Sequence, residues 1–110
     1  ASVAARKGWL LSQRHVAGEL TADDGAIQVL LGKGVSLLPV GCLGVQGKFE
    51  RGDLVRIVDG TGAGVAQGLV NYSSQECQQL LGRSSDEIAQ VLGYCNEDEL
   101  VNRDNMALLR

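Results

Sequence analysis

Four basic residues around a glycine-rich stretch give this sequence its clearest capacity for chemistry, which is the binding of phosphate groups. Lys33, Lys48, Arg51 and Arg56 accompany glycines at positions 41, 44 and 47. Lysine and arginine side chains beside exposed backbone amides hold phosphates, so one interpretation is an edge that binds nucleic acid. The other is an ordinary charged surface, because the net charge of the chain is −3. Phe49 is the only aromatic residue in this stretch, so any RNA would be recognised by shape and backbone rather than by stacked bases.

The remaining motifs indicate turns and helix caps rather than catalysis. The glycines of residues 60–64 resemble a phosphate loop, but such a loop requires a helix directly after it. Here a strand-like segment follows, which predicts a β-hairpin. His15 is the only histidine and has no metal-ligand spacing around it. Asp23 and Asp24 precede an apolar helical stripe and are typical N-caps. We therefore expect no catalytic residue, no cofactor site and no metal site in this chain.

Composition favours one small, turn-rich β domain that positions these residues. The chain has 110 residues, of which 15 are glycine and one is proline, which suits turns with positive φ. Cys42, Cys77 and Cys95 form no C-x-x-C pair and are expected to be reduced, buried side chains. That pattern predicts a cytoplasmic protein. No apolar run is long enough to cross a membrane. The sequence begins without Met, and we therefore expect a piece of a longer chain.

The first half of the chain predicts two short strands, a helix and a third strand. The two strands are expected over 9–12 and 19–22. The helix follows the two aspartates and ends at the glycines of positions 32 and 34. Pro39 cannot donate to a strand ladder and marks a strand boundary, so the third strand is expected over 43–49. The side chains expected in the core here are Leu37, Leu38 and Val45.

The second half predicts a hairpin, two short helices and a last strand. Strands are expected over 54–59 and 65–71, after a turn at 51–53 and on either side of the glycine hairpin. The segments SSQECQQLLG and SSDEIAQVLG are near copies, and each opens with a capping box and closes with Leu-Gly. Such short helices must pack on a sheet. With a last strand over 99–108 and no regular βαβ alternation, the pattern favours a small mixed barrel over a doubly wound sheet.

Four segments together resemble a PUA domain: GELTADDGA (18–26), GVSLLPVG (34–41), VQGKFERGDLVRI (45–57) and AQGLVNYSS (66–74). The resemblance implies a mixed β fold with short α segments, a PUA-like pseudo-barrel of mostly antiparallel strands with about three short helices. PUA domains of several RNA-modifying proteins dock onto structured RNA, with the loop after the first helix and the next strand as the RNA-facing edge. The RNA-binding candidates that this implies are Lys33, Gly34, Ser36, Leu38, Gly41, Lys48, Arg51 and Arg56.

Three further segments resemble the C-terminal region of the bacterial glutamate 5-kinase family: ARKGWL (5–10), S-x-E-I-x-x-x-L-G-Y (85–94) and NRDNM (102–106). This implies that residues 1–14 form a junction to an amino-acid-kinase domain and that residues 15–110 form the PUA domain. Enzymes of that family use ATP and Mg²⁺ to phosphorylate the γ-carboxylate of glutamate, in the first step of proline synthesis. ATP and Mg²⁺ are expected in the kinase domain, not in this chain.

Two hypotheses follow from these resemblances and stay open at this point. In the first, the chain is a non-catalytic regulatory or assembly module whose partners are its own kinase domain and sister subunits. In the second, it is an RNA-binding module that acts independently of the kinase. Gln67, Gly8 and Asn102 stand where the family more often has basic or histidine side chains, and the loss of basic positions weakens phosphate binding but not the fold.

Overall fold

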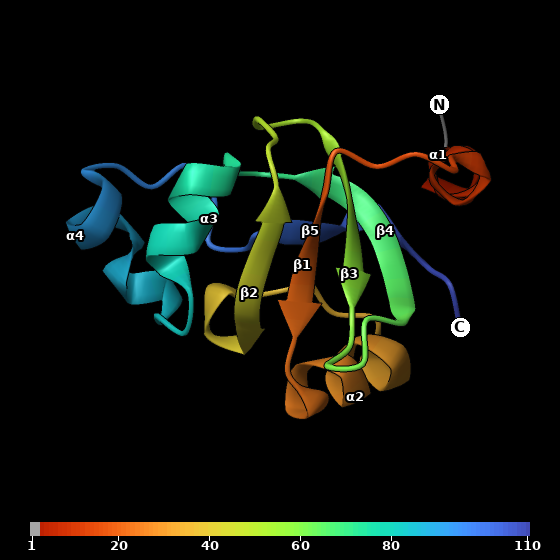
Figure 1. The fold of residues 1–110 in the computed structure, drawn as a ribbon, viewed down its shortest axis with the longest axis horizontal. Helices are drawn as coiled ribbons and strands as arrows, with labels where there is room; N and C mark the ends of the chain where they lie inside the picture. The colour runs from red at the N-terminus through yellow and green to blue at the C-terminus, as the bar shows by residue number, and fades with distance from the viewer. Residues whose placement is uncertain (1–2) are drawn as a thin grey trace.

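The core of the molecule is one curved, five-stranded sheet. The computed structural model describes residues 3–110, with side chains described from residue 7 onward. The sheet order is β2-β1-β3-β4-β5, and every neighbouring pair is antiparallel except β1 and β3, which run parallel. Figure 1 shows β5 passing behind β1 and β3. The strands are β1 (Gly18–Ala22), β2 (Cys42–Gly47), β3 (Leu54–Val58), β4 (Gly64–Val70) and β5 (Val101–Leu108).

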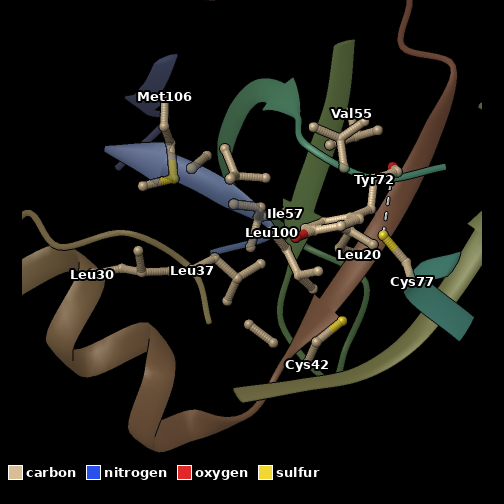
Figure 2. Packing of buried hydrophobic residues seen from close by; sticks show 14 of the residues in the cluster. Leu20, Leu30, Leu37, Cys42, Val55, Ile57, Tyr72, Cys77, Leu100 and Met106 are labelled. Carbon is tan, nitrogen blue, oxygen red and sulfur yellow. Dashed lines mark hydrogen bonds between the residues drawn. The ribbon is translucent and has the colours of Figure 1, made fainter. Parts of the chain in front are cut away.

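A short bridge draws the two halves of the sheet together. Leu37, which lies just before β2, pairs with Val101 of β5. The amide of Leu37 donates to the carbonyl of Val101 at 3.0 Å, and the amide of Leu100 donates to the carbonyl of Leu37 at 2.8 Å. Leucine, valine and isoleucine side chains fill the interior around Tyr72, as Figure 2 shows. The mixed, PUA-like architecture predicted from the sequence is therefore confirmed.

Within residues 3–110 the structure contains four α-helices and two short 3₁₀ turns around this sheet. In Figure 1, α2 closes one end of the strands, α3 and α4 stand beside β2, and α1 lies near β4 at the opposite side. The contacts of α1 are with β5 and β4. These elements are α1 (Val3–Ser12), α2 (Asp24–Lys33), η1 (Pro39–Gly41), α3 (Ser74–Leu80), η2 (Ser85–Glu87) and α4 (Ile88–Leu92).

The strand expected over residues 9–12 is wrong, because those residues form the last turn of α1. Leu10 is fully buried while Trp9 and Leu11 are exposed. In a run this short, a strand and a helix that buries one residue give the same sequence pattern. The other strands and helices occur where they were expected, within a few residues at their ends. Residues 1 and 2 of the predicted junction lie outside the described residues.

The predicted caps explain where the helices begin and end. Asp23 accepts a hydrogen bond from the amide of Ala26 at 2.7 Å, and Gly34 ends α2 with φ of 62°, a left-handed conformation that favours glycine. Ser73 and Glu76 form the reciprocal capping box of α3. The near copy that starts at Ser84 differs, because it begins as the 3₁₀ turn η2 and only then continues as α4.

The cysteines divide into two buried thiols and one exposed thiol. Cys42 and Cys77 lie in the core, as expected, and Figure 2 shows Cys77 directed at the backbone carbonyl of Tyr72, which its thiol contacts at 3.7 Å. Burial raises the pKa of Cys42 to about 11 and that of Cys77 to about 12. Cys95 is exposed, so its predicted burial is wrong. Across residues 3–110, no helix has both the length and the apolar character needed to cross a bilayer.

Candidate functional site

The structure gathers the first part of the predicted RNA-binding set at one groove beside α2. Ser36, Leu38 and Gly41 line a depression of about 280 Å³, and Lys33 and Gly34 stand at the end of α2 that leads into it. The predicted burial of Leu38 is wrong, because its side chain is exposed at this groove. We call this depression the α2 groove, and its lining is Asp23, Gly25, Ala26, Val29, Val35, Ser36, Leu38, Val40 and Gly41.

Close backbone packing forms the floor of the α2 groove. The amide of Asp23 donates to the carbonyl of Gly41 at 2.9 Å, which holds η1 against the start of α2. A Cβ atom at Gly41 would lie 2.7 Å from the Cβ of Ala26, a distance too short for two carbon atoms. Glycine at position 41 is therefore required for this approach. It allows Leu38 and Val40 to project outward on either side of the buried Pro39.

Exposed apolar side chains form part of the lining of the α2 groove. Val40 is 54% exposed, and Val29 and Leu38 are also exposed. Lys33 is exposed at the end of α2. Ser36 accepts a hydrogen bond from the backbone amide of Arg103 at 2.9 Å, which brings β5 to the groove. Sequence reasoning missed this neighbour, because nothing in the local pattern pairs residues so far apart in the chain.

Lys48 and Arg51 lie elsewhere, on the turn that connects β2 to β3. Lys48 lines a second cleft of about 720 Å³ together with Ser74, Gln75, Gln78 and Gln79 of α3. The amide of Ser74 donates to the carbonyl of Phe49 at 2.9 Å and joins the two walls. Arg51 forms an ion pair with Glu97 at 2.5 Å. The amide-rich wall was not predicted, because exposed glutamines on a helix have no distinguishing sequence pattern.

Arg56 lies at a third place, on β3, where its hydrogen bonds help to hold the end of α1 on the sheet. Its Nε and Nη2 atoms donate to the side-chain oxygen of Gln67 at 3.1 and 3.0 Å. The side-chain nitrogen of Gln67 donates in turn to the carbonyls of Leu10 at 2.8 Å and Gln13 at 3.1 Å. Arg56 also reaches the carbonyl of Arg14 at 3.4 Å. We call Arg56, Gln67 and these carbonyls the Gln67 network.

The Gln67 network satisfies polar groups that would otherwise be buried without partners. Gln67 is only 2% exposed, yet both its amide oxygen and its amide nitrogen are hydrogen-bonded. Helices leave their last carbonyls without intrahelical donors, and here a side chain of β4 supplies donors to the end of α1. The glutamine that weakened the phosphate-binding hypothesis is therefore a structural residue, and half-buried Arg56 is committed to it.

Hydrogen bonds between side chains also account for a polar cluster at the first turn of α3. The hydroxyl of Tyr94 donates to Glu76, and that of Tyr72 donates to the carbonyl of Glu97. The hydrogen bond to Glu76 raises the pKa of Tyr94 to about 12, so the tyrosine remains a donor at neutral pH. Within the part of the chain that the structure describes, no three histidine, cysteine or carboxylate side chains come together as metal ligands do.

The fold is that of a known class of domain. Residues 18–92 match the family model of the PUA domain, so the chain belongs to the PUA domain family. A PUA domain from Aeropyrum pernix K1 superposes with a TM-score of 0.56 at 24% identity, covering 78% of this chain and 41% of that one.

Two of the similar solved structures are ribonucleoprotein assemblies. The archaeal box H/ACA sRNP Nop10-Cbf5 complex matches with a TM-score of 0.51 at 26% identity, over 58% of this chain and 20% of the other. An H/ACA RNP bound to a substrate RNA matches with a TM-score of 0.50 at 28% identity, over 56% of this chain and 19% of the other.

Relatives with curated functions are glutamate 5-kinases. The protein from Stutzerimonas stutzeri is 54% identical over 96% of this chain and 28% of its own length. That from Nitrosospira multiformis is 48% identical over 98% of this chain and 29% of its own length. The chain therefore spans less than a third of the relatives it matches.

Proposed function

We propose that this chain is the PUA module of a cytoplasmic glutamate 5-kinase and that it contributes to the assembly and regulation of that enzyme rather than to its chemistry. The parent protein would use ATP and Mg²⁺ to phosphorylate the γ-carboxylate of glutamate in a separate kinase domain. Every step of that reaction is placed in the kinase domain, and none is assigned to the residues of this chain.

One observation carries this proposal. Identity of 54% extends over 96% of the chain but over only 28% of the relative. It includes α1 and β5, which lie outside the matched PUA segment of residues 18–92. Similarity to these enzymes therefore extends beyond the general features of a PUA domain. The apolar groove and the amide-rich cleft on this chain are surfaces on which another part of an enzyme could pack.

The test is a comparison of the full-length protein with a version that lacks these 110 residues. The full-length protein is expected to phosphorylate glutamate with ATP and Mg²⁺. The shortened protein is expected to differ in its kinetics, in its inhibition by proline or in its number of subunits. If all three properties match those of the full-length protein, the module has no regulatory or assembly role.

A second function, RNA binding, is favoured by the α2 groove. Ser36, Leu38 and Gly41 line this groove, and Lys33 is the last residue of the helix beside it. The support from similarity is a fold shared with part of an RNP bound to a substrate RNA. Electrostatic binding would weaken with salt, with a slope of about −0.7 for each phosphate contact with single-stranded RNA.

Charge-reversal substitutions at the two surfaces can locate such binding. Structured RNAs are titrated at two salt concentrations with wild type, with Lys33→Glu at the α2 groove, and with Lys48→Glu plus Arg51→Glu at the second cleft. If the groove binds RNA, Lys33→Glu weakens affinity and reduces the salt slope by about one phosphate contact. RNA binding is rejected for this chain if wild type shows no titratable binding at low salt.

A further inference from the structure

Helix α1 is a fixed part of the folded domain. It packs on β5 and β4, Leu10 is fully buried beneath it, and the Gln67 network binds the carbonyls of Leu10 and Gln13 from strands far away in the chain. A flexible connection would leave these carbonyls to water, whereas a buried glutamine with both ends occupied fixes one orientation. The other sides of α1 are therefore held in a defined position on the domain.

Two large apolar side chains of α1 are exposed to solvent on those other sides. Each residue turns about 100° around a helix, so Trp9 and Leu11 lie on the two flanks of the face that Leu10 buries. Trp9 is 52% exposed and Leu11 is 47% exposed. Gly8 points away from the sheet, with nothing within 4 Å of the place where its Cβ would be. Lys7 and Ser12 of the same helix are exposed and polar, so the exposed apolar area of the described side chains is confined to Trp9 and Leu11. Large apolar side chains on a helix surface usually pack against another element.

The pattern of similarity indicates what covers this helix. The PUA family model begins at residue 18 and does not include α1. The match to the Stutzerimonas stutzeri glutamate 5-kinase, however, covers 96% of the chain and so reaches into α1. About seven tenths of that relative lies outside the match, which covers 28% of its length. A helix shared with these enzymes, but not required by the PUA fold, fits a contact with the rest of such an enzyme.

We propose that the outer face of α1, formed by Gly8, Trp9 and Leu11, is the surface on which the catalytic part of the same enzyme packs. The contact rests on the proposed function, because it needs a kinase domain in the parent protein. Trp9 and Leu11 provide the apolar area of this contact. At position 8, where the family more often has a basic residue, the glycine of this chain leaves room for the backbone of the partner to approach closely. The Gln67 network is then the device that fixes the orientation of this surface.

The experiment uses the full-length protein with a photo-crosslinking phenylalanine analogue at one position at a time. Positions 9 and 11 are the test sites, and position 43 is the control, because Leu43 is 61% exposed and lies on β2 at the opposite edge of the sheet. We expect crosslinks from positions 9 and 11 to peptides outside these 110 residues, with several times the yield obtained from position 43. Equal yields, or crosslinks that stay within the 110 residues, would overturn the proposal.

A second variant keeps the test independent of the crosslinker. Gly8→Val adds side-chain volume where this domain has open space, so the domain itself should fold as before. In the full-length protein the same change should reduce the crosslinking from position 11 several-fold. Gly32→Val is the control, since Gly32 also lies in a helix with nothing within 4 Å. An undiminished yield in Gly8→Val contradicts the close approach.

A second measurement distinguishes failure of this docking surface from failure of the proposed function. Glutamate kinase activity of the same full-length protein is measured alongside the crosslinks. An active enzyme without preferential crosslinks from positions 9 and 11 overturns the docking surface alone. A full-length protein without glutamate kinase activity overturns the proposed function, whatever the crosslinks show.

Discussion

Arg56 of the Gln67 network and Lys33 at the end of α2 are both basic residues, but their surroundings differ. In the network, an arginine and a glutamine are bonded to each other and to backbone carbonyls. Lys33 is exposed at the end of α2, and the apolar side chains of Val29 and Val40 are exposed at the nearby groove. The difference teaches that a basic residue beside glycines marks a binding surface only if its neighbours leave it free. Three experiments test these two regions and a fourth sets the Gln67 network against the turn at Asp59, from the largest expected effect to the smallest.

The largest effect is expected from Gln67→Ala. This change leaves the buried carbonyl of Leu10 without its donor and removes the acceptor of Arg56. Leaving a buried polar group unsatisfied costs about 1–3 kcal/mol, so we expect the free energy of unfolding to fall by about 2–3 kcal/mol in total. Urea unfolding of wild type and Gln67→Ala measures this loss of unfolding free energy.

The matched control is Gln90→Ala, at an exposed glutamine of α4. Its unfolding free energy should stay within about 0.5 kcal/mol of wild type, as for most surface substitutions. If Gln67→Ala were as mild as Gln90→Ala, α1 would not be held by the network.

These residues also show how far the sequence predicts the molecule. Local signals such as the capping box of Ser73, the hairpin glycines and the alternating strands predicted the elements, because each depends on neighbours within a few residues. The four basic residues lie at three separate places in the structure, and their positions depend on contacts between residues far apart in the chain. Arg56 meets Gln67 across two strands, and Gln67 meets a helix more than fifty residues away. No local pattern contains that information.

Alanine substitutions at Gly25 and Gly41 compare two positions within the α2 groove. A methyl group at Gly41 would lie 2.7 Å from the Cβ of Ala26, whereas at Gly25 the nearest atom is an oxygen of Asp23 at 3.5 Å. Gly41→Ala should therefore destabilise the protein by about 2 kcal/mol through overpacking. Gly25→Ala, inside α2, should stabilise it by about 0.5–1 kcal/mol. Urea unfolding of both variants provides the measurement, and effects of the same sign would mean that the groove floor can shift to make room.

The two basic residues themselves provide the direct comparison. Arg56→Met removes the donors to the oxygen of buried Gln67 and should cost about 1–2 kcal/mol of unfolding free energy. Lys33→Met, at an exposed position with no role in packing, should change it by less than about 0.5 kcal/mol. Thermal and urea unfolding measure both changes. A larger loss for Lys33→Met than for Arg56→Met would reverse the assignment of the two regions.

The smallest effect is expected in how stability depends on pH. In the hairpin between β3 and β4, Asp59 accepts hydrogen bonds from the side chain and amide of Thr61 at 2.6 and 2.9 Å, and from Arg110 at 2.5 Å. The hydrogen bond from Thr61, followed by that from Arg110, holds the pKa of the Asp59 carboxyl well below its usual value. A lowered folded-state pKa adds stability above the unfolded-state pKa of about 3.9, and that stability is lost as pH falls towards the folded-state value.

Asp59→Asn should therefore destabilise the protein more at about pH 6 than at about pH 2.5, because at the lower pH the wild-type carboxyl has already lost part of its advantage. Gln67→Ala should cost nearly the same at both values, since the amide of Gln67 carries no ionisable group. Urea unfolding of wild type and both variants at the two pH values gives the comparison. A pH-independent cost for Asp59→Asn would show that the turn is held by the shape of its hydrogen bonds and not by the charge of Asp59.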